Sequence, residues 1–331
     1  MFLSFLVFDN IFLNILVLVV GMVFLIKGAD LFVDGSSAVA KKLKIPSLII
    51  GLTLVSMGTS APEAAVSISA ALKGLDASSV GNIVGSDIFN TLFILGASAI
   101  FTPLVISKEM KKYDIPIMIA IYVVLILCGF VITPGKLDLV ESIIFILLFI
   151  GYITFLILRT KKTNKEKGIQ DDIKEEKDNG QKMGIVKSII FIVLGLAGIV
   201  GGGTIVVNSA EAIAKAAGMS DLLVGLTILA VGTSLPELVT SIVASIKKES
   251  DIAVGNVVGS NIFNVIFILG ASSTISRLSI EQTQLFDMLV MLGSGLLLCG
   301  ISLFSKKINR VSGIILFLLY IAYLVFIIIR N

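Results

Sequence analysis

The chain contains two copies of an oxygen-rich motif, and a constant shift of 174 residues relates them. Aligned at that shift, residues 51–98 match residues 225–272 at 27 of 48 positions. The shared residues are mostly Gly, Ser, Thr, Pro, Glu and Asn, so the match preserves polar identity and not only hydrophobicity. The motifs are Gly-Thr-Ser-Ala-Pro-Glu at 58–63 and Gly-Ser-Asp-Ile-Phe-Asn at 85–90, then Gly-Thr-Ser-Leu-Pro-Glu at 232–237 and Gly-Ser-Asn-Ile-Phe-Asn at 259–264.

The side chains of the two copies could coordinate a hard cation. Steps of three and four residues place Ser56 to Glu63 on one helical face, and Ser86 and Asn90 are one turn apart. Carboxylate, hydroxyl, amide and carbonyl oxygens suit Ca²⁺ or Na⁺ rather than soft transition metals. The candidate ligands are Ser56, Thr59, Ser60, Glu63, Ser86 and Asn90, then Ala230 (through its carbonyl), Thr233, Ser234, Glu237, Ser260 and Asn264.

Charge counting favours exchange of one cation for another. Glu63 and Glu237 together carry two negative charges, which balance one Ca²⁺ or two Na⁺. Two kinds of ion that compete for the same glutamates cannot both be bound there. Mutually exclusive occupancy is the physical basis of antiport.

The composition predicts an all-α polytopic membrane protein. Of 331 residues, 56% are hydrophobic and 15% are charged, and the mean hydropathy is +1.05. Soluble domains carry about 25% charged residues. Spans need roughly 17–25 apolar residues. Ten are expected, at about 10–33, 45–72, 79–103, 114–133, 138–158, 184–214, 219–246, 253–276, 284–305 and 308–330.

The two glutamates fall near the middle of the second and seventh predicted spans. An ionisable residue inside a membrane is costly and therefore a functional candidate. Pro62 and Pro236 lack an amide hydrogen, and each ring clashes with a carbonyl one turn earlier, so both helices should kink. Carbonyls freed at such a break are tolerated only where protein, water or a cation meets them. Discontinuous helices are therefore expected at a site near the membrane midplane.

The predicted spans divide into two halves with a charged linker between them. Five spans lie in 1–158 and five in 184–331, and the two repeats occupy about 45–103 and 219–276. Residues 159–183 are too charged to build a core and predict a linker. Because five is odd, the second half must enter the membrane from the opposite side. Inverted repeats are typical of secondary transporters, which alternate access to a site between the halves.

Loop charges predict the orientation in a cell membrane. In the ten-span arrangement, 20 basic residues fall on one side and five on the other. Because Lys and Arg near helix ends stay cytoplasmic, both termini should be outside and the 159–183 loop cytoplasmic.

Other functions are disfavoured by composition. The net charge of +3 is an average over both sides of the membrane and implies no nucleic-acid partner. The chain has no His, so neither a His-containing zinc site nor a His-Glu-x-x-His metalloprotease is available. No enzyme and no cofactor are expected. The expected partners are Ca²⁺, Na⁺ and membrane lipid, and the expected assembly is a monomer.

At these motifs the chain resembles the cation/calcium antiporter superfamily, most closely the prokaryotic sodium/calcium exchangers. The resemblance rests on the paired Gly-Thr-Ser-x-Pro-Glu and Gly-Ser-x-Ile-Phe-Asn motifs and covers essentially all ten predicted spans. It implies that Glu63 and Glu237 hold calcium, with backbone oxygens of Thr59 and Thr233. It implies that the first and sixth spans slide as gating helices, and that three Na⁺ are exchanged per Ca²⁺. Sodium would add Ser56, Ser60, Ser86, Asn90, Ala230, Ser234, Ser260 and Asn264.

Details of the motifs separate the branches of that superfamily. The resemblance favours sodium coupling, because the proton-coupled branch has Gly-Asn where this chain has Gly-Thr-Ser. It disfavours potassium dependence, because the potassium-dependent branch has Asp where this chain has Asn264. Proton/calcium exchange and a cation channel are the alternatives. Asp87, whose repeat counterpart is Asn261, is interpreted as a carboxylate hydrogen-bonded across helices or to water.

Overall fold

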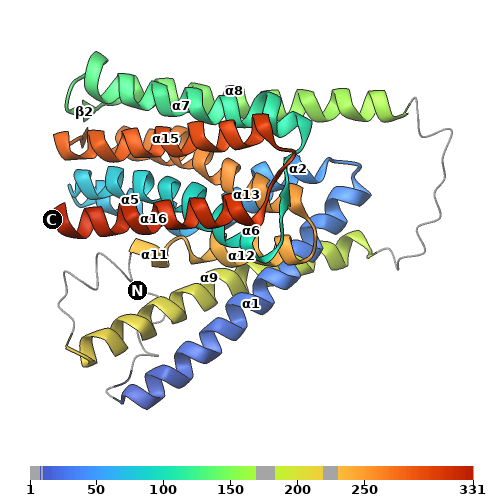
Figure 1. Ribbon diagram of the computed structural model, residues 1–331, viewed down its shortest axis with the longest axis horizontal. Coiled ribbons are helices and arrows are strands. Elements are labelled where there is room, and N and C mark those ends of the chain that lie inside the picture. The colour runs from blue at the N-terminus through green and yellow to red at the C-terminus, as the bar shows by residue number, and fades with distance from the viewer. Residues whose placement is uncertain (1–7, 9, 169–182, 219–229, 331) are drawn as a thin grey trace.

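The computed structural model describes residues 8, 10–168, 183–218 and 230–330, which form a bundle of helices (Figure 1). The first half contains α1 (Ile11–Lys42), α2 (Ser47–Ile50), η2 (Gly51–Val55), α3 (Ser56–Thr59), α4 (Ala61–Leu72), α5 (Asp76–Ile88), η3 (Phe89–Ile94), α6 (Leu95–Phe101), β1 (Leu104–Val105), η4 (Met110–Asp114), α7 (Ile115–Leu127), η5 (Cys128–Ile132), β2 (Lys136–Leu137) and α8 (Leu139–Gly168). The second contains α9 (Ile185–Ala216), α11 (Ala230–Gly232), α12 (Leu235–Ile246), α13 (Ser250–Phe263), η8 (Asn264–Leu269), α14 (Gly270–Ile275), β3 (Leu278–Ser279), α15 (Gln282–Phe304), β4 (Lys307–Ile308) and α16 (Arg310–Arg330). The segments labelled η are π-helical turns.

Eight helices of the described chain are long and apolar enough to span a membrane, or nine if the bent pair Ser47–Thr59 and Ala61–Leu72 is one span. The mostly helical membrane fold is therefore as predicted, while the count of ten is not established. The seventh predicted span begins in residues 219–229, which lie outside the described residues, and its other part is the apolar helix α12.

The boundary of the predicted linker differs from the structure. We expected it to start at residue 159, but α8 continues as helix to Gly168. Arg159 explains the first turn of the extension, because its guanidinium donates to both carboxylate oxygens of Asp114, at 2.9 and 3.0 Å. The Lys and Glu residues that follow are good helix formers, so the helix can continue.

The helices of the two halves recur at the shift found in the sequence. Adding 174 to the bounds of α1 gives those of α9, and adding it to the bounds of α4 gives those of α12. Left-handed backbone also recurs in pairs: Lys44 (φ 54°) with Gly218 (φ 86°), and Gly74 (φ 67°) with Lys248 (φ 62°). The repeat therefore extends from the sequence to the helix bounds and to the turns that follow the helices.

Four two-residue strands, which the sequence analysis did not predict, tie the halves together. β1 pairs antiparallel with β4, and β2 pairs antiparallel with β3. Each strand of the first half therefore bonds to a strand of the second half.

The helices α1 and α9 lie side by side and slant across the rest of the bundle (Figure 1). Their backbones touch at glycines: a Cβ on Gly28 would lie 2.6 Å from the Ile199 nitrogen, and one on Gly202 would lie 2.5 Å from the Leu25 nitrogen. Because Gly21 meets Ile205 while Gly35 meets Ile192, the two helices are antiparallel. A seam of small residues is how membrane helices approach closely.

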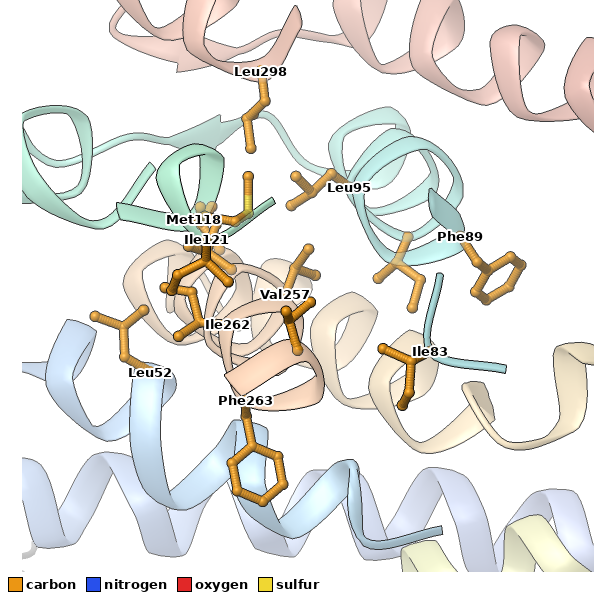
Figure 2. Packing of buried hydrophobic residues seen from close by; sticks show 14 of the residues in the cluster. Leu52, Ile83, Phe89, Leu95, Met118, Ile121, Val257, Ile262, Phe263 and Leu298 are labelled. Carbon is orange, nitrogen blue, oxygen red and sulfur yellow. The ribbon is translucent and has the colours of Figure 1, made fainter. Parts of the chain in front are cut away.

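The centre of the bundle is formed by the continuous helical segments 76–101 and 250–275. In the most apolar 18-residue stretch of each segment, 78% and 94% of the residues are buried. In the corresponding stretches of the other full-length spans, 17–39% of the residues are buried. Figure 2 shows Met118 and Ile121 of α7 next to Ile262 of α13 in this core. The peripheral helices expose many large apolar side chains, as expected of a lipid-facing surface.

Candidate cation-binding site

The polar site is built around two matching helix breaks. Between α3 and α4 the chain bends by 49°. Ser60 at that break has φ −79° and ψ 7°, and Ser234 before α12 has φ −91° and ψ 7°. Pro62 and Pro236 each stand within the first two positions of the following helix, where a missing amide hydrogen costs nothing. The kink predicted at Pro62 is confirmed, and a matching break precedes Pro236.

Each break presents a glutamate at a helix N-terminus. Glu63 lies in the first turn of α4 and Glu237 in the first turn of α12, where the helix dipole favours negative charge. Both side chains are fully buried. The carboxylates therefore sit inside the protein.

The serines of the two motifs bond crosswise to the glutamates. The Ser60 hydroxyl donates to Oε1 of Glu237 at 2.8 Å, and the Ser234 hydroxyl donates to Oε1 of Glu63 at 2.9 Å. Each serine thus serves the glutamate of the other half. The site is a joint product of the two repeats, and neither repeat could form it alone.

Two more serines extend this network. The Ser60 hydroxyl also lies 2.9 Å from Oγ of Ser260, and Ser86 Oγ lies 3.0 Å from Oγ of Ser234. Ser86 is also 3.5 Å from Oε1 of Glu63, and Ser260 is 3.5 Å from the Ser56 carbonyl oxygen. The predicted hydroxyl ligands therefore gather in one buried cluster, although the helix that carries Ser56 to Glu63 is broken and not one continuous face.

The two predicted asparagines lie where π-helical turns interrupt the central helices. Asn90 is in η3, which contacts α12, and Asn264 begins η8, which contacts α4. The Asn90 amide donates to Oδ1 of Asn261 at 3.0 Å, and the Asn264 amide donates to Oδ1 of Asp87 at 2.9 Å. The interpretation of Asp87 as a carboxylate hydrogen-bonded across helices is confirmed.

Several buried oxygens in this region have no hydrogen-bond partner among the described residues. Buried polar atoms are nearly always satisfied, so each exception needs an explanation. A bound cation would supply one, since all of these atoms can act as oxygen ligands. They are Glu63 Oε2, Glu237 Oε2, Asp87 Oδ2, Asn90 Oδ1, Asn264 Oδ1 and Thr233 Oγ1.

The remaining predicted ligands are placed less fully. Thr59 is buried, and its hydroxyl donates to Oδ1 of Asn256 at 3.0 Å. Thr233 follows α11, and Ala230 begins that helix next to residues outside the described part. Sequence reasoning missed Asn256, which also donates to Ser241 Oγ at 2.9 Å. The signal was available, because Asn82 is its repeat counterpart.

Neutral oxygens outnumber charged ones in the site. Within the described ranges, no group of three or more Cys, Asp or Glu side chains is placed to hold a metal ion. A cation here would be held by two glutamates with hydroxyl, amide and carbonyl oxygens. That donor set fits Na⁺ and Ca²⁺ and offers no soft ligand.

The other acidic residues of the long helices lie away from this cluster. Asp30 and Asp34 of α1 form ion pairs with Lys247, at 2.7 and 2.6 Å. Glu211 of α9 pairs with Lys215 one turn later, at 2.9 Å. All three are partly exposed.

Comparisons with known proteins agree with this architecture. The family described as "Sodium/calcium exchanger protein" matches residues 13–158 and 187–329. The chain is 35% identical to "Sodium/calcium exchanger MaX1" of Methanosarcina acetivorans, over 94% of this chain and 97% of that protein. It is 35% identical to "Inner membrane protein YrbG" of Escherichia coli, over 78% and 79%. The solved structure of the sodium-calcium exchanger NCX_Mj superposes with a TM-score of 0.81 at 30% identity, covering 95% of this chain and 98% of that one.

Proposed function

Because the chain belongs to the sodium/calcium exchanger family, a family of transporters and not of enzymes, we propose that it exchanges Na⁺ for Ca²⁺ across the cell membrane at the paired-glutamate site. One observation carries the proposal. Serines of each half bond crosswise to the glutamate of the other, and both glutamates keep a buried oxygen without a partner among the described residues. The name of the relative MaX1 supports the same pair of ions.

In this proposal the two ions exclude one another. Ca²⁺ would be held mainly by Glu63 and Glu237, with carbonyl oxygens of Thr59 and Thr233. Their two negative charges would balance one Ca²⁺. Na⁺ ions would use the same carboxylates, so sodium entry displaces calcium. The additional sodium ligands would be Ser56, Ser60, Ser86, Asn90, Ala230, Ser234, Ser260 and Asn264, for three Na⁺ per Ca²⁺.

Transport would proceed by alternating access between two inverted five-helix halves with ten spans in all. The antiparallel contact of α1 with α9, the elements repeated at one shift and the reciprocal strand pairs support this topology. The glycine seam would keep α1 and α9 together while both slide against the rest to open the site on either side. The start of α1 and the end of α16 lie at one end of the bundle, while α8 ends and α9 begins at the other (Figure 1). This fits outside termini and a cytoplasmic 159–183 loop.

The test is uptake of radioactive Ca²⁺ into proteoliposomes loaded with Na⁺ and diluted into Na⁺-free choline buffer at equal pH. We expect uptake that requires internal Na⁺ and saturates with Ca²⁺. Uptake driven by an imposed pH gradient and indifferent to Na⁺ would instead indicate proton/calcium exchange. Unsaturating Ca²⁺ current without a counter-ion would indicate a channel. Either result would refute the proposal.

A further inference from the structure

The two asparagines of the site depend on other residues for their orientation. A side-chain amide carries an oxygen at one end and an NH₂ group at the other, and its hydrogen bonds decide which end faces where. Asn264 donates its NH₂ group to Asp87, and Asn90 donates its NH₂ group to Asn261. Both amide oxygens are left buried without a partner among the residues described. Each oxygen is therefore free for a cation.

Asp87 and Asn261 orient the two asparagines with different side chains. Asn261 is itself an amide, and its NH₂ group donates to Oγ1 of Thr91 at 2.8 Å, which leaves its oxygen for Asn90. Asp87 stands at the equivalent position of the first half, and the counterpart of Thr91 is Val265, in a segment that contacts α5. A valine offers no acceptor, but a carboxylate needs none because it has no NH₂ group. In both halves, the orienting residue therefore keeps a side-chain oxygen that accepts from the NH₂ group of an asparagine.

We propose that Asp87, and Asn261 with Thr91, are positioning residues that hold the oxygens of Asn264 and Asn90 toward the transported cation. This inference rests on the proposed function and extends it to residues outside the ligand set. Asp87 acts through Asn264, and Asn261 acts through Asn90. Loss of either positioning residue should weaken cation binding more than it lowers the maximal rate, since the glutamates remain in place.

Substitutions that convert each arrangement into the other separate the effect of amide orientation from the effect of the Asp87 charge. In Asp87→Asn the new NH₂ group has no threonine to donate to, because the counterpart of Thr91 is Val265, so the amide can turn and no longer fixes Asn264. Adding Val265→Thr recreates the arrangement of the other half and should restore orientation, although it restores no charge. The mirror series is Thr91→Val, which leaves the Asn261 NH₂ group only the Met118 sulfur at 3.6 Å, followed by Thr91→Val with Asn261→Asp.

The Tyr122 hydroxyl needs its own control. It is buried and lies next to Asp87, Thr91 and Asn261. It could accept from a new amide at position 87, so the Asp87→Asn series is repeated with Tyr122→Phe. Val265→Thr alone and a thermal unfolding curve for each protein report any loss of folding.

The experiment measures the half-saturating Na⁺ and Ca²⁺ concentrations and the maximal rate of exchange in proteoliposomes. Residues that orient metal ligands typically change affinity by about 10–100-fold. We expect the half-saturating concentrations to rise by this factor in Asp87→Asn and to return toward the wild-type value in Asp87→Asn/Val265→Thr. The same pattern is expected in the Tyr122→Phe background. An Asp87→Asn variant equal to wild type, or a double variant no better than the single one, would overturn the proposal.

Binding measurements keep this test independent of transport. Equilibrium binding of radioactive Ca²⁺ to the detergent-solubilised proteins should show the same loss and rescue. If wild-type protein binds Ca²⁺ with this pattern but shows no sodium-dependent uptake, the proposed function fails and the positioning stands. If wild-type exchange is normal but the rescue is absent from both assays, the positioning fails and the proposed function stands.

Discussion

The two halves of the molecule are alike at the glutamates and differ around them. At the centre, Ser60 and Ser234 exchange partners, each bonding to the glutamate of the other half at nearly the same distance. Around this centre some positions differ between the halves: Asp87 corresponds to Asn261 and Ser56 corresponds to Ala230. The surrounding differences are where unequal numbers and affinities of the two ions would originate.

The long helices differ in the same way. α1 is tied to the end of α12, because Lys247 pairs with Asp30 and Asp34 and the Ser37 hydroxyl donates to Glu249 at 2.6 Å. The counterparts on α9 of the two aspartates and of Ser37 are Thr204, Asn208 and Glu211. Within the described chain, the counterpart of Lys247, Lys73, makes no ion pair with them. Of the two long helices, α1 therefore makes more polar contacts with the end of α12 than α9 makes with the equivalent residue of the first half.

Neutralising either glutamate should have the largest effect. Glu63→Gln or Glu237→Gln removes half of the charge that balances Ca²⁺, so sodium-dependent Ca²⁺ uptake should be abolished by both. The control is Glu211→Gln, an acidic residue paired with its own neighbour away from the site. Full uptake by either site variant would contradict the assignment.

The crosswise serines should have the next largest effect, and an equal one. A hydrogen bond to a charged group contributes about 1.5–3 kcal/mol. Ser60→Ala and Ser234→Ala should each raise the half-saturating Ca²⁺ concentration by about tenfold or more, since 1.4 kcal/mol is a factor of ten. A large effect from one serine and none from the other would break the symmetry on which the comparison rests.

A methyl group in the glycine seam should destabilise the fold. Gly28→Ala places a Cβ against the backbone of α9, and overpacking of this kind costs about 1–3 kcal/mol. The variant should unfold at a lower temperature in detergent. Gly151→Ala is the matched control, because a Cβ there meets no described atom within 4 Å. Equal unfolding curves for the two variants would show that the seam is not close-packed.

The ion pairs of α1 should contribute least. Exposed ion pairs are worth about 0–1 kcal/mol, and both aspartates are more than a third exposed. Lys247→Met should lower the unfolding temperature slightly, and the difference should vanish in high salt as the charges are screened. Lys73→Met, its repeat counterpart, should leave the curve unchanged. A greater loss from Lys73→Met would contradict the assignment of more polar contacts to α1.

These comparisons also show what the sequence could predict. The length of the apolar stretches predicted the spans, and the positions of Pro62 and Pro236 predicted the helix breaks, because both are local properties of the chain. The bond from Asn264 to Asp87 was not predicted, because its partners are 177 residues apart. Residues that touch across the halves are set by how the halves pack, which spacing within one repeat cannot reveal.

The π-helical turns were missed for a related reason. Asn90 and Asn264 lie in stretches whose sequence is typical of ordinary apolar helix. The wider π-helical turn is stabilised by tertiary contacts, which local sequence does not show. The extension of α8 beyond residue 158 likewise depends on a tertiary contact, the pairing of Arg159 with Asp114 on a neighbouring helix.

Competition between the two ions at equilibrium tests the central claim most directly. Radioactive Ca²⁺ would be bound to purified wild-type protein in detergent and titrated with Na⁺ at constant ionic strength, with choline as the replacement cation. Shared use of Glu63 and Glu237 predicts one Ca²⁺ per chain, displaced completely and steeply by Na⁺ and not by choline. Calcium that stays bound at saturating Na⁺ would contradict a single site built by both halves.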